Sequence, residues 1–174
     1  MINRELINPQ SIVVVGGSNN VHKPGGRLVR NLLDGKYKGE LYVVNAKEDD
    51  VQGLKSYHSV HDIPETELAI ISIPGPACPE AVDVLAKQKN VKAFIVISAG
   101  FGEETHEGAI LEEQMLKSIN EAGASLIGPN CIGLMNMHSH GVFTQPIPEF
   151  HADGVDFISS SGCTAIFLIV SALT

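Results

Sequence analysis

A glycine-flanked polar loop near the N-terminus is the first segment whose residue types could bind a ligand. It follows the apolar run 13–15, reads Gly16-Gly17-Ser18-Asn19-Asn20, and closes at Gly25-Gly26. Backbone N–H groups in such a loop, and at the start of a helix that follows it, favour bound anions. The spacing matches neither GxGxxG nor GxxxxGK(S/T). The loop therefore predicts a phosphate-binding segment, with a plain strand-to-helix connection as the alternative.

Lys47 is the second residue with a chemical implication. It follows the apolar run 41–44, where a nicotinamide dinucleotide site usually carries an acidic residue that binds the ribose hydroxyl. A lysine suits a phosphate on the ribose instead. NADP and coenzyme A (CoA) both carry such a phosphate, so both stay open. A solvated lysine also stays open, because residues 48–50 are acidic.

Strand and helix patterns alternate around these loops. Apolar runs predict strands at 13–15, 41–44, 68–73, 93–97 and 125–127. Amphipathic spacing predicts a helix that opens at Gly25-Gly26 and is closed by Gly35, and further helices over about 78–89 and 107–122. This alternation predicts an α/β fold, a Rossmann-like doubly wound parallel sheet with right-handed crossovers.

A change of pattern after residue 145 predicts a domain boundary. We expect a first domain over residues 1–145, ending in the proline-bearing stretch 145–148. A strand at 155–158, a small-residue turn at 159–162 and an apolar helix at 163–174 then predict the start of a second α/β, flavodoxin-like domain over 152–174, cut short. The alternative is that this unit extends the first sheet.

Composition excludes several classes of protein. The 174 residues include 12 Lys+Arg and 20 Asp+Glu, a net charge of −8, which argues against a general nucleic-acid binder. With 44% hydrophobic residues the chain can form a core. Three scattered cysteines indicate a reducing compartment. The start has no apolar signal region and the run 165–173 is too short to span a bilayer, so we expect a cytoplasmic protein without a membrane partner.

In an open parallel sheet the ligand lies beyond the carboxyl ends of the strands. Five loops are expected there, at 16–26, 45–47, 73–77, 98–102 and 128–133. Four of them are rich in Gly, Pro, Ser or Asn. This agreement between loops is more informative than any one of them.

Six motifs occur in a recognisable order along the chain. They are Val15-Gly16-Gly17-Ser18, Arg30-Asn31-Leu32-Leu33, Val44-Asn45-Ala46-Lys47, Ile73-Pro74, Ser98-Ala99-Gly100-Phe101 and Gly128-Pro129-Asn130-Cys131-Ile132-Gly133. The series resembles the CoA-binding domain of the NDP-forming acyl-CoA synthetases over about residues 8–170. That family includes the ADP-forming acetyl-CoA synthetases and the α subunit of succinyl-CoA synthetase.

The resemblance implies CoA as the cofactor and assigns residues to its parts. Four groups are implied: Gly16, Gly17, Ser18, Asn19 and Asn20 at the CoA phosphates; Lys47 at the ADP-ribose phosphate; Pro74, Ser98, Ala99 and Gly100 along the adenine and pantetheine path; Asn130 and Cys131 near the thiol. The turn Ser160-Ser161-Gly162 would open a helix that faces the acyl phosphate and a phosphohistidine.

The resemblance also implies a reaction that this chain cannot complete alone. The complete enzyme would join a carboxylic acid to CoA with ATP or GTP and Mg, through an acyl phosphate and a phosphohistidine. That histidine is expected beyond residue 174, because none of the seven histidines lies in a Gly-His-x-Gly setting. No catalytic residue is therefore assigned here, and further C-terminal domains or a separate ATP-grasp subunit are implied as partners.

Other possible sites and functions were also considered from the sequence. No metal site is assigned, because His58-x-x-His61 and His138-x-His140 lack a third ligand at matching spacing. Cys131 is expected to be a packing residue rather than a nucleophile. Two alternative functions stay open, a stand-alone CoA- or nucleotide-binding regulatory module and an NADP-dependent oxidoreductase. The bare apolar helix 163–174 further predicts self-association into a homo-oligomer.

Overall fold

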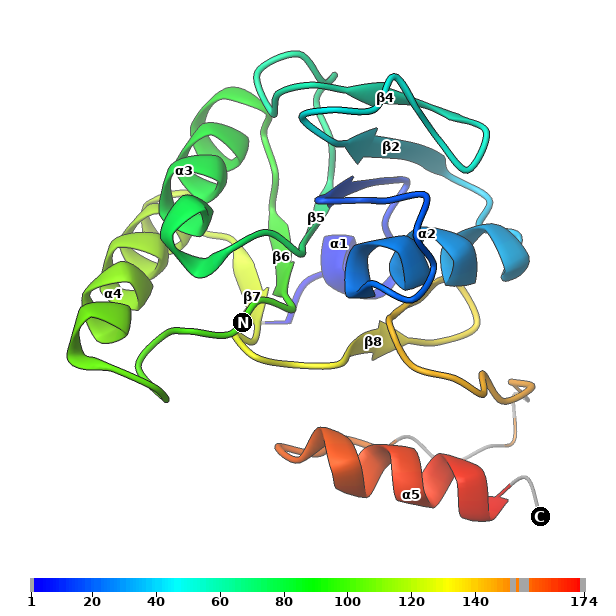
Figure 1. Ribbon diagram of the computed structural model, residues 1–174. Helices are drawn as coiled ribbons and strands as arrows, with labels where there is room; N and C mark the ends of the chain where they lie inside the picture. The colour runs from blue at the N-terminus through cyan, green and yellow to red at the C-terminus, as the bar shows by residue number, and fades with distance from the viewer. Residues whose placement is uncertain (1, 151–152, 154–156, 173–174) are drawn as a thin grey trace.

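A seven-stranded sheet forms the centre of the computed structural model, which describes residues 2–150, 153 and 157–172 (Figure 1). Its order is β3-β4-β2-β1-β5-β6-β7, and every neighbouring pair is parallel except the antiparallel pair β3–β4. The strands are β1 (Ser11–Val15), β2 (Glu40–Val44), β3 (Asp50–Val51), β4 (Leu54–Tyr57), β5 (Leu68–Ile71), β6 (Ala93–Val96) and β7 (Ser125–Ile127). The predicted Rossmann-like doubly wound sheet is confirmed.

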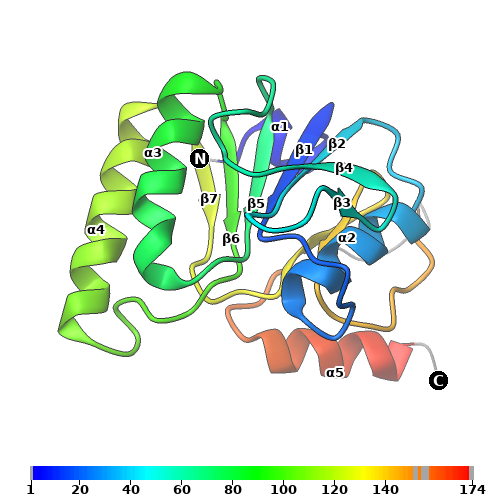
Figure 2. The same ribbon diagram turned by 45° about the horizontal axis from the view of Figure 1, so that its top comes forward.

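Helices cover both faces of this sheet (Figures 1 and 2). In β1, Val13 and Val15 belong to one buried cluster, which includes residues of α3 (Cys78–Gln88) and α4 (His106–Glu121). Ile12 and Val14 belong to a second cluster, which includes residues of α2 (Pro24–Asp34). Both faces are buried, which explains why the central strands are continuous apolar runs. Two short elements, α1 (Arg4–Ile7) and the 3₁₀ turn η1 (Gly75–Ala77), complete this part of the chain.

Two hairpins were not predicted from the sequence. The β3–β4 hairpin adds an edge to the sheet beside β2, and its strands are too short and polar to show a pattern. The second hairpin pairs β8 (Gly133–Met135) with β9 (His140–Val142). It lies on α2, where the buried Asn31 Nδ2 donates to the carbonyls of Val142 (2.7 Å) and Thr144 (3.0 Å).

The C-terminal region confirms one predicted element and corrects another. The predicted apolar helix is present as α5 (Gly162–Ala172), while residues 173–174 lie outside the described residues. Of the predicted strand 155–158, residues 155–156 also lie outside them, and Phe157 and Ile158 form no strand. An apolar run becomes a strand only beside a neighbouring strand, and Ile158 is instead 89% exposed. The domain limits 1–145 and 152–174 stay predictions.

Candidate functional site

The carboxyl ends of the parallel strands bring the predicted binding loops to one edge of the sheet. The chain leaves β1 toward α2 on one face and leaves the neighbouring β5 toward α3 on the other face. Between two such strands the loops diverge, and this is where open α/β sheets bind ligands. The loop 16–26 borders that point on one side, and the loop 72–77 borders it on the other.

Glycines make the 16–26 loop compact. Gly16 has a φ of +91°, in the left-handed region that glycine adopts at low cost. A side chain at Gly25 would meet the carbonyl group of Gly16, and one at Gly26 would meet the carbonyl group of Asn20. The start of α2 is therefore held directly against the end of β1. Lys23, at the N-cap of α2, makes no side-chain capping bond, so the helix start is available to an external acceptor.

Three amide side chains hold this loop against the β3–β4 hairpin and the segment before it. We call Asn19, Asn45 and Gln52 the amide clamp. Asn45 Nδ2 donates to the Gly17 carbonyl (2.7 Å), and Asn19 Nδ2 donates to the Asp50 carbonyl (2.9 Å) and to Glu48. Gln52 Nε2 donates to the carbonyls of Ser18 and Gly26, both at 2.8 Å.

Backbone amides of the same loop are left for a ligand. Among the described residues, the N–H groups of Gly17, Ser18 and Asn19 make no hydrogen bond. Both groups of the Asn19 side chain are already used, because Nδ2 donates to Glu48 and the Asp50 carbonyl and Oδ1 accepts from the Gln52 N–H. Asn20 Oδ1 accepts from the His22 N–H (2.9 Å), while its Nδ2 makes no hydrogen bond among the described residues. Any contact that Asn19 makes with a phosphate would therefore come from its backbone rather than from its side chain.

Lys47 lies exposed beside this loop. Its backbone N–H donates to Asn45 Oδ1 (2.8 Å), so the amide clamp also fixes the turn that carries the lysine. Within residues 2–150, no carboxylate lies within ion-pair distance of its ammonium group. His58 supports the same turn, with Nδ1 3.2 Å from the Asn45 carbonyl oxygen and Nε2 2.9 Å from Asp49 Oδ1. An unpaired lysine at this edge can meet a phosphate.

The residues implied for the pantetheine path lie along the next loops of the same edge. Ser98 Oγ donates to the Ile73 carbonyl (2.6 Å), which ties the end of β6 to the residue before Pro74. Ala99 is exposed, and Glu103 accepts from the Gly100 N–H at 3.0 Å. That amide is therefore occupied by the protein itself, unlike the amides of the 16–26 loop.

Asn130 and Cys131 follow β7 at this edge. The Asn130 N–H donates to the Ser98 carbonyl (2.9 Å), so these two loops are joined. The Cys131 thiol lies 3.3 Å from the Val96 carbonyl oxygen, and burial raises its pKa. A raised pKa disfavours the nucleophilic thiolate, as expected for a packing cysteine.

The turn at Ser160, Ser161 and Gly162 begins α5, and Gly162 lies against the side chain of Ile132. The structure thus brings the start of α5 to the loop that carries Asn130 and Cys131. The Ser161 N–H donates to Ser159 Oγ (3.0 Å), and Ser161 Oγ accepts from the Thr164 N–H (3.4 Å). This turn is separate from the 16–26 loop in the hydrogen-bond network.

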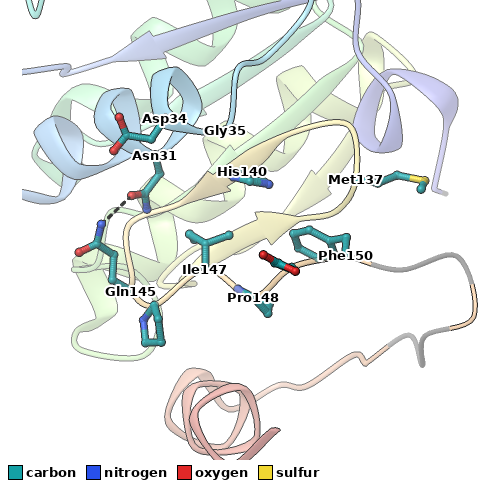
Figure 3. Close-up of a pocket in the computed structure, with 11 residues that line it drawn as sticks. Asn31, Asp34, Gly35, Met137, His140, Gln145, Ile147, Pro148 and Phe150 are labelled. Carbon is teal, nitrogen blue, oxygen red and sulfur yellow. Dashed lines mark hydrogen bonds between the residues drawn. The ribbon is translucent and has the colours of Figure 1, made fainter. Parts of the chain in front are cut away.

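A groove of about 980 Å³ lies away from all these residues (Figure 3). It is bordered by the C-terminal end of α2, the β8–β9 hairpin and the segment 145–150, and Asn31, His140 and Phe150 are among its lining residues. Along α2, the helix rises by ~7.5 Å from Gly26, the last residue of the 16–26 loop, to Asn31 at the groove. None of the residues implied for CoA lines this groove.

Sequence reasoning missed Gln52. The turn that carries it could have been suspected from the sequence, since Gln52 and Gly53 form a two-residue hairpin connection with φ of +54° and +86°, but its contacts with the 16–26 loop could not. A glycine flanked by short polar strands is a weak signal, because apolar alternation is absent there.

Comparisons with known proteins identify the family of the chain. The family described as a CoA binding domain matches residues 10–137. The chain is 36% identical over 170 residues to the α subunit of acetate–CoA ligase (ADP-forming) II of Pyrococcus furiosus, covering 97% of this chain and 36% of the relative. It is 35% identical over 161 residues to acetate–CoA ligase (ADP-forming) II of Archaeoglobus fulgidus, covering 91% and 24%.

A solved structure gives the same result. The dinucleotide-forming acetyl-coenzyme A synthetase 1 of Ca. Korarchaeum cryptofilum, in complex with phosphate and ADP, superposes with a TM-score of 0.86 at 34% identity. The match covers 97% of this chain and 36% of that chain, so this sequence spans about a third of such a protein. The segment matched in these relatives is the CoA-binding α-subunit portion of ADP-forming acyl-CoA synthetases. The chain therefore belongs to the CoA-binding domain family.

Proposed function

We propose that this chain binds CoA at the carboxyl edge of its sheet, with the phosphates on the 16–26 loop and the ribose phosphate beside Lys47. The observation that carries the proposal is the set of unpaired amides at Gly17, Ser18 and Asn19, next to an ammonium group without an ion-pair partner in residues 2–150. Pro74, Ser98, Ala99 and Gly100 would border the rest of the ligand. Asn130 and Cys131 would lie toward its thiol end.

Isothermal titration of CoA, dephospho-CoA and NADPH into the chain tests this proposal. Lys47 is exposed, so its contact with the 3′-phosphate should contribute about 1 kcal/mol, or about fivefold in Kd. Lys47→Ala should weaken CoA by that factor and leave dephospho-CoA unchanged. Lys38→Ala, another exposed lysine, is the matched control and should leave both affinities unchanged. Binding of NADPH without CoA would overturn the proposal and favour an oxidoreductase.

We further propose that the chain serves as the CoA-binding part of a larger acid–thiol ligase. The named relatives are ADP-forming ligases for acetate, and the chain spans only part of each. In the complete enzyme, ATP or GTP with Mg, a carboxylic acid and a phosphohistidine would be handled by further domains or by an ATP-grasp subunit. Ser160, Ser161 and Gly162 would face that region from the start of α5.

The three free cysteines support a reducing, cytoplasmic location for the protein.

The division of labour can be tested with the chain alone. Supplied with acetyl-CoA, ADP, phosphate and Mg, it should bind the thioester without consuming it. Thioester absorbance followed over time is the measurement, with the buffer alone as reference. Protein-dependent loss of the thioester would show that the chain carries its own catalytic group and would contradict this assignment.

A further inference from the structure

One side chain of the amide clamp joins both ends of the 16–26 loop. The Gln52 Nε2 atom donates to the Ser18 carbonyl near the beginning of the loop and to the Gly26 carbonyl in the first turn of α2, each at 2.8 Å. The two acceptors are eight residues apart in the sequence. Both N–H bonds of one nitrogen are thus used, and their fork sets the distance between the two ends of the loop.

The orientation of this amide is determined by its partners. If the group were reversed, its oxygen would face two carbonyl oxygens, so the nitrogen must occupy this position. The oxygen Oε1 is then shielded from solvent and has no hydrogen-bond partner among the described residues. A buried acceptor without a donor is unfavourable, so the two bonds of Nε2 must outweigh that cost.

The backbone at Gln52 is also held in an unfavourable conformation. Its φ of +54° lies in the left-handed region, which is uncommon for a residue other than glycine, asparagine or aspartate. Its N–H donates to Asn19 Oδ1 (2.7 Å), so the turn is fixed to the loop through its main chain as well. Strain that persists in a turn can indicate a functional constraint on the side chain it presents.

The direction of the loop amides follows from the direction of the loop carbonyls. In a planar trans peptide, the C=O of one residue and the N–H of the next point to opposite sides. The Gly17 carbonyl points to Asn45 and the Ser18 carbonyl points to Gln52. The Ser18 N–H must therefore point away from the Asn45 side chain, and the Asn19 N–H must point away from the Gln52 side chain. These two amides make no hydrogen bond among the described residues.

We infer that Gln52 is the positioning residue of the phosphate site. It touches no ligand itself, and it orients the Asn19 amide toward the diphosphate of CoA by holding the Ser18 carbonyl on the opposite side. This inference rests on the proposed function, because it assumes that the 16–26 loop receives the CoA phosphates. It assigns the β3–β4 hairpin a role in ligand binding.

The test compares CoA affinity in wild type, Gln52→Met and Gln52→Asn by isothermal titration. Methionine keeps the length of the side chain and removes both donors. Asparagine suits the left-handed turn, so the hairpin is retained, and it is one methylene too short to bridge the two carbonyls. We expect Kd to rise about 10-fold in both variants. Gln114→Met, at an exposed position of α4, is the matched control and should bind like wild type.

Amide chemical shifts separate positioning from general damage. In wild type, CoA should shift the N–H signals of Ser18 and Asn19 as well as those of the 98–100 loop. In Gln52→Asn the shift at Asn19 should shrink while those of residues 98–100 persist. Wild-type affinity in either Gln52 variant would overturn the inference and leave the proposed function intact. Failure of wild type to bind CoA would instead refute the proposed function.

A measurement on wild type alone keeps the inference testable if a variant does not fold. The two side-chain N–H protons of Gln52, both donated to carbonyls, should exchange with solvent more slowly than those of the exposed Gln114. Equal exchange rates for the two side chains would show that the bridge is absent in solution and would overturn the inference.

Discussion

Removal of the Asn31 side-chain amide should destabilise the whole chain rather than one loop. Asn31 is 2% exposed and lies in α2, and its Nδ2 donates to the carbonyls of Val142 and Thr144. Gln145 Nε2 in turn donates to its Oδ1 at 3.4 Å, so one side chain joins α2 to β9 and to the segment that follows (Figure 3).

The size of the effect follows from what Asn31→Ala leaves behind. Three hydrogen bonds are lost, of which the one from Gln145 is long and adds little, and two carbonyl groups lose their side-chain partner. With about 1 kcal/mol for each lost bond, and up to 2 where a buried carbonyl stays unpaired, the free energy of unfolding should fall by ~2–4 kcal/mol. For a chain of 174 residues, about 1 kcal/mol corresponds to ~2–4 °C in Tm, so Tm should fall by ~5–15 °C.

Urea unfolding followed by circular dichroism measures this change. Asn120→Ala, at an exposed asparagine of α4, is the matched control and should stay within about 0.5 kcal/mol of wild type. Asn31→Asp should cost more than Asn31→Ala at neutral pH, because a carboxylate would face two carbonyl oxygens. An Asn31→Ala variant as stable as wild type would refute the view that this amide holds the hairpin on α2.

Four further outcomes are expected. Gly25→Ala should weaken CoA more than 10-fold in a titration, because the added methyl group meets a backbone carbonyl; unchanged affinity would contradict the compact loop. Iodoacetamide at neutral pH should label the exposed Cys163 before Cys131, whose pKa is raised by burial, as read by peptide mass spectrometry, and equal rates would contradict this order. Burial lowers the pKa of His140 in the folded chain, so below about pH 6.5 the unfolded chain binds more protons at this residue than the folded chain does. The free energy of unfolding should therefore fall as the pH is lowered through this range. His140→Gln should make the free energy of unfolding less dependent on pH in urea titrations at several pH values. Phe167 is 70% exposed on α5, and sedimentation should show self-association that Phe167→Ser reduces; a concentration-independent monomer in wild type would count against it.

The parallel sheet could be predicted because each of its central strands is a short apolar run bounded by a turn signal. The strand predicted at 68–73 was too long, because β5 ends at Ile71 and the apolar Ile73 lies beyond it. It failed for the β3–β4 hairpin because alternation needs more than two to four residues to be visible. It failed at 157–158 because a run of apolar residues does not reveal whether a partner strand is beside it.

The residues of the candidate site also differ in how far they could be predicted from the sequence. Residues whose proposed roles depend on local chemistry, such as the glycines of the 16–26 loop and Lys47, could be proposed from their type and spacing. Gln52 could not be proposed in this way, because its role depends on contacts with Gly26 and Ser18, which lie 26 and 34 positions earlier in the sequence. The residues next to Gln52 give no indication of these contacts. Asn45 was visible within a motif, but its bond to the Gly17 carbonyl required the pairing of β1 with β2.

The chemical nature of the amide clamp has a consequence for ionic strength. Asn19, Asn45 and Gln52 are neutral at every physiological pH, and their partners are mostly backbone carbonyls. Neutral hydrogen bonds are little affected by added salt, whereas the attraction between an exposed lysine and a phosphate is screened within about 10 Å at 0.1 M. Raising the salt concentration should therefore weaken capture of the ligand while the loop that receives it keeps its shape.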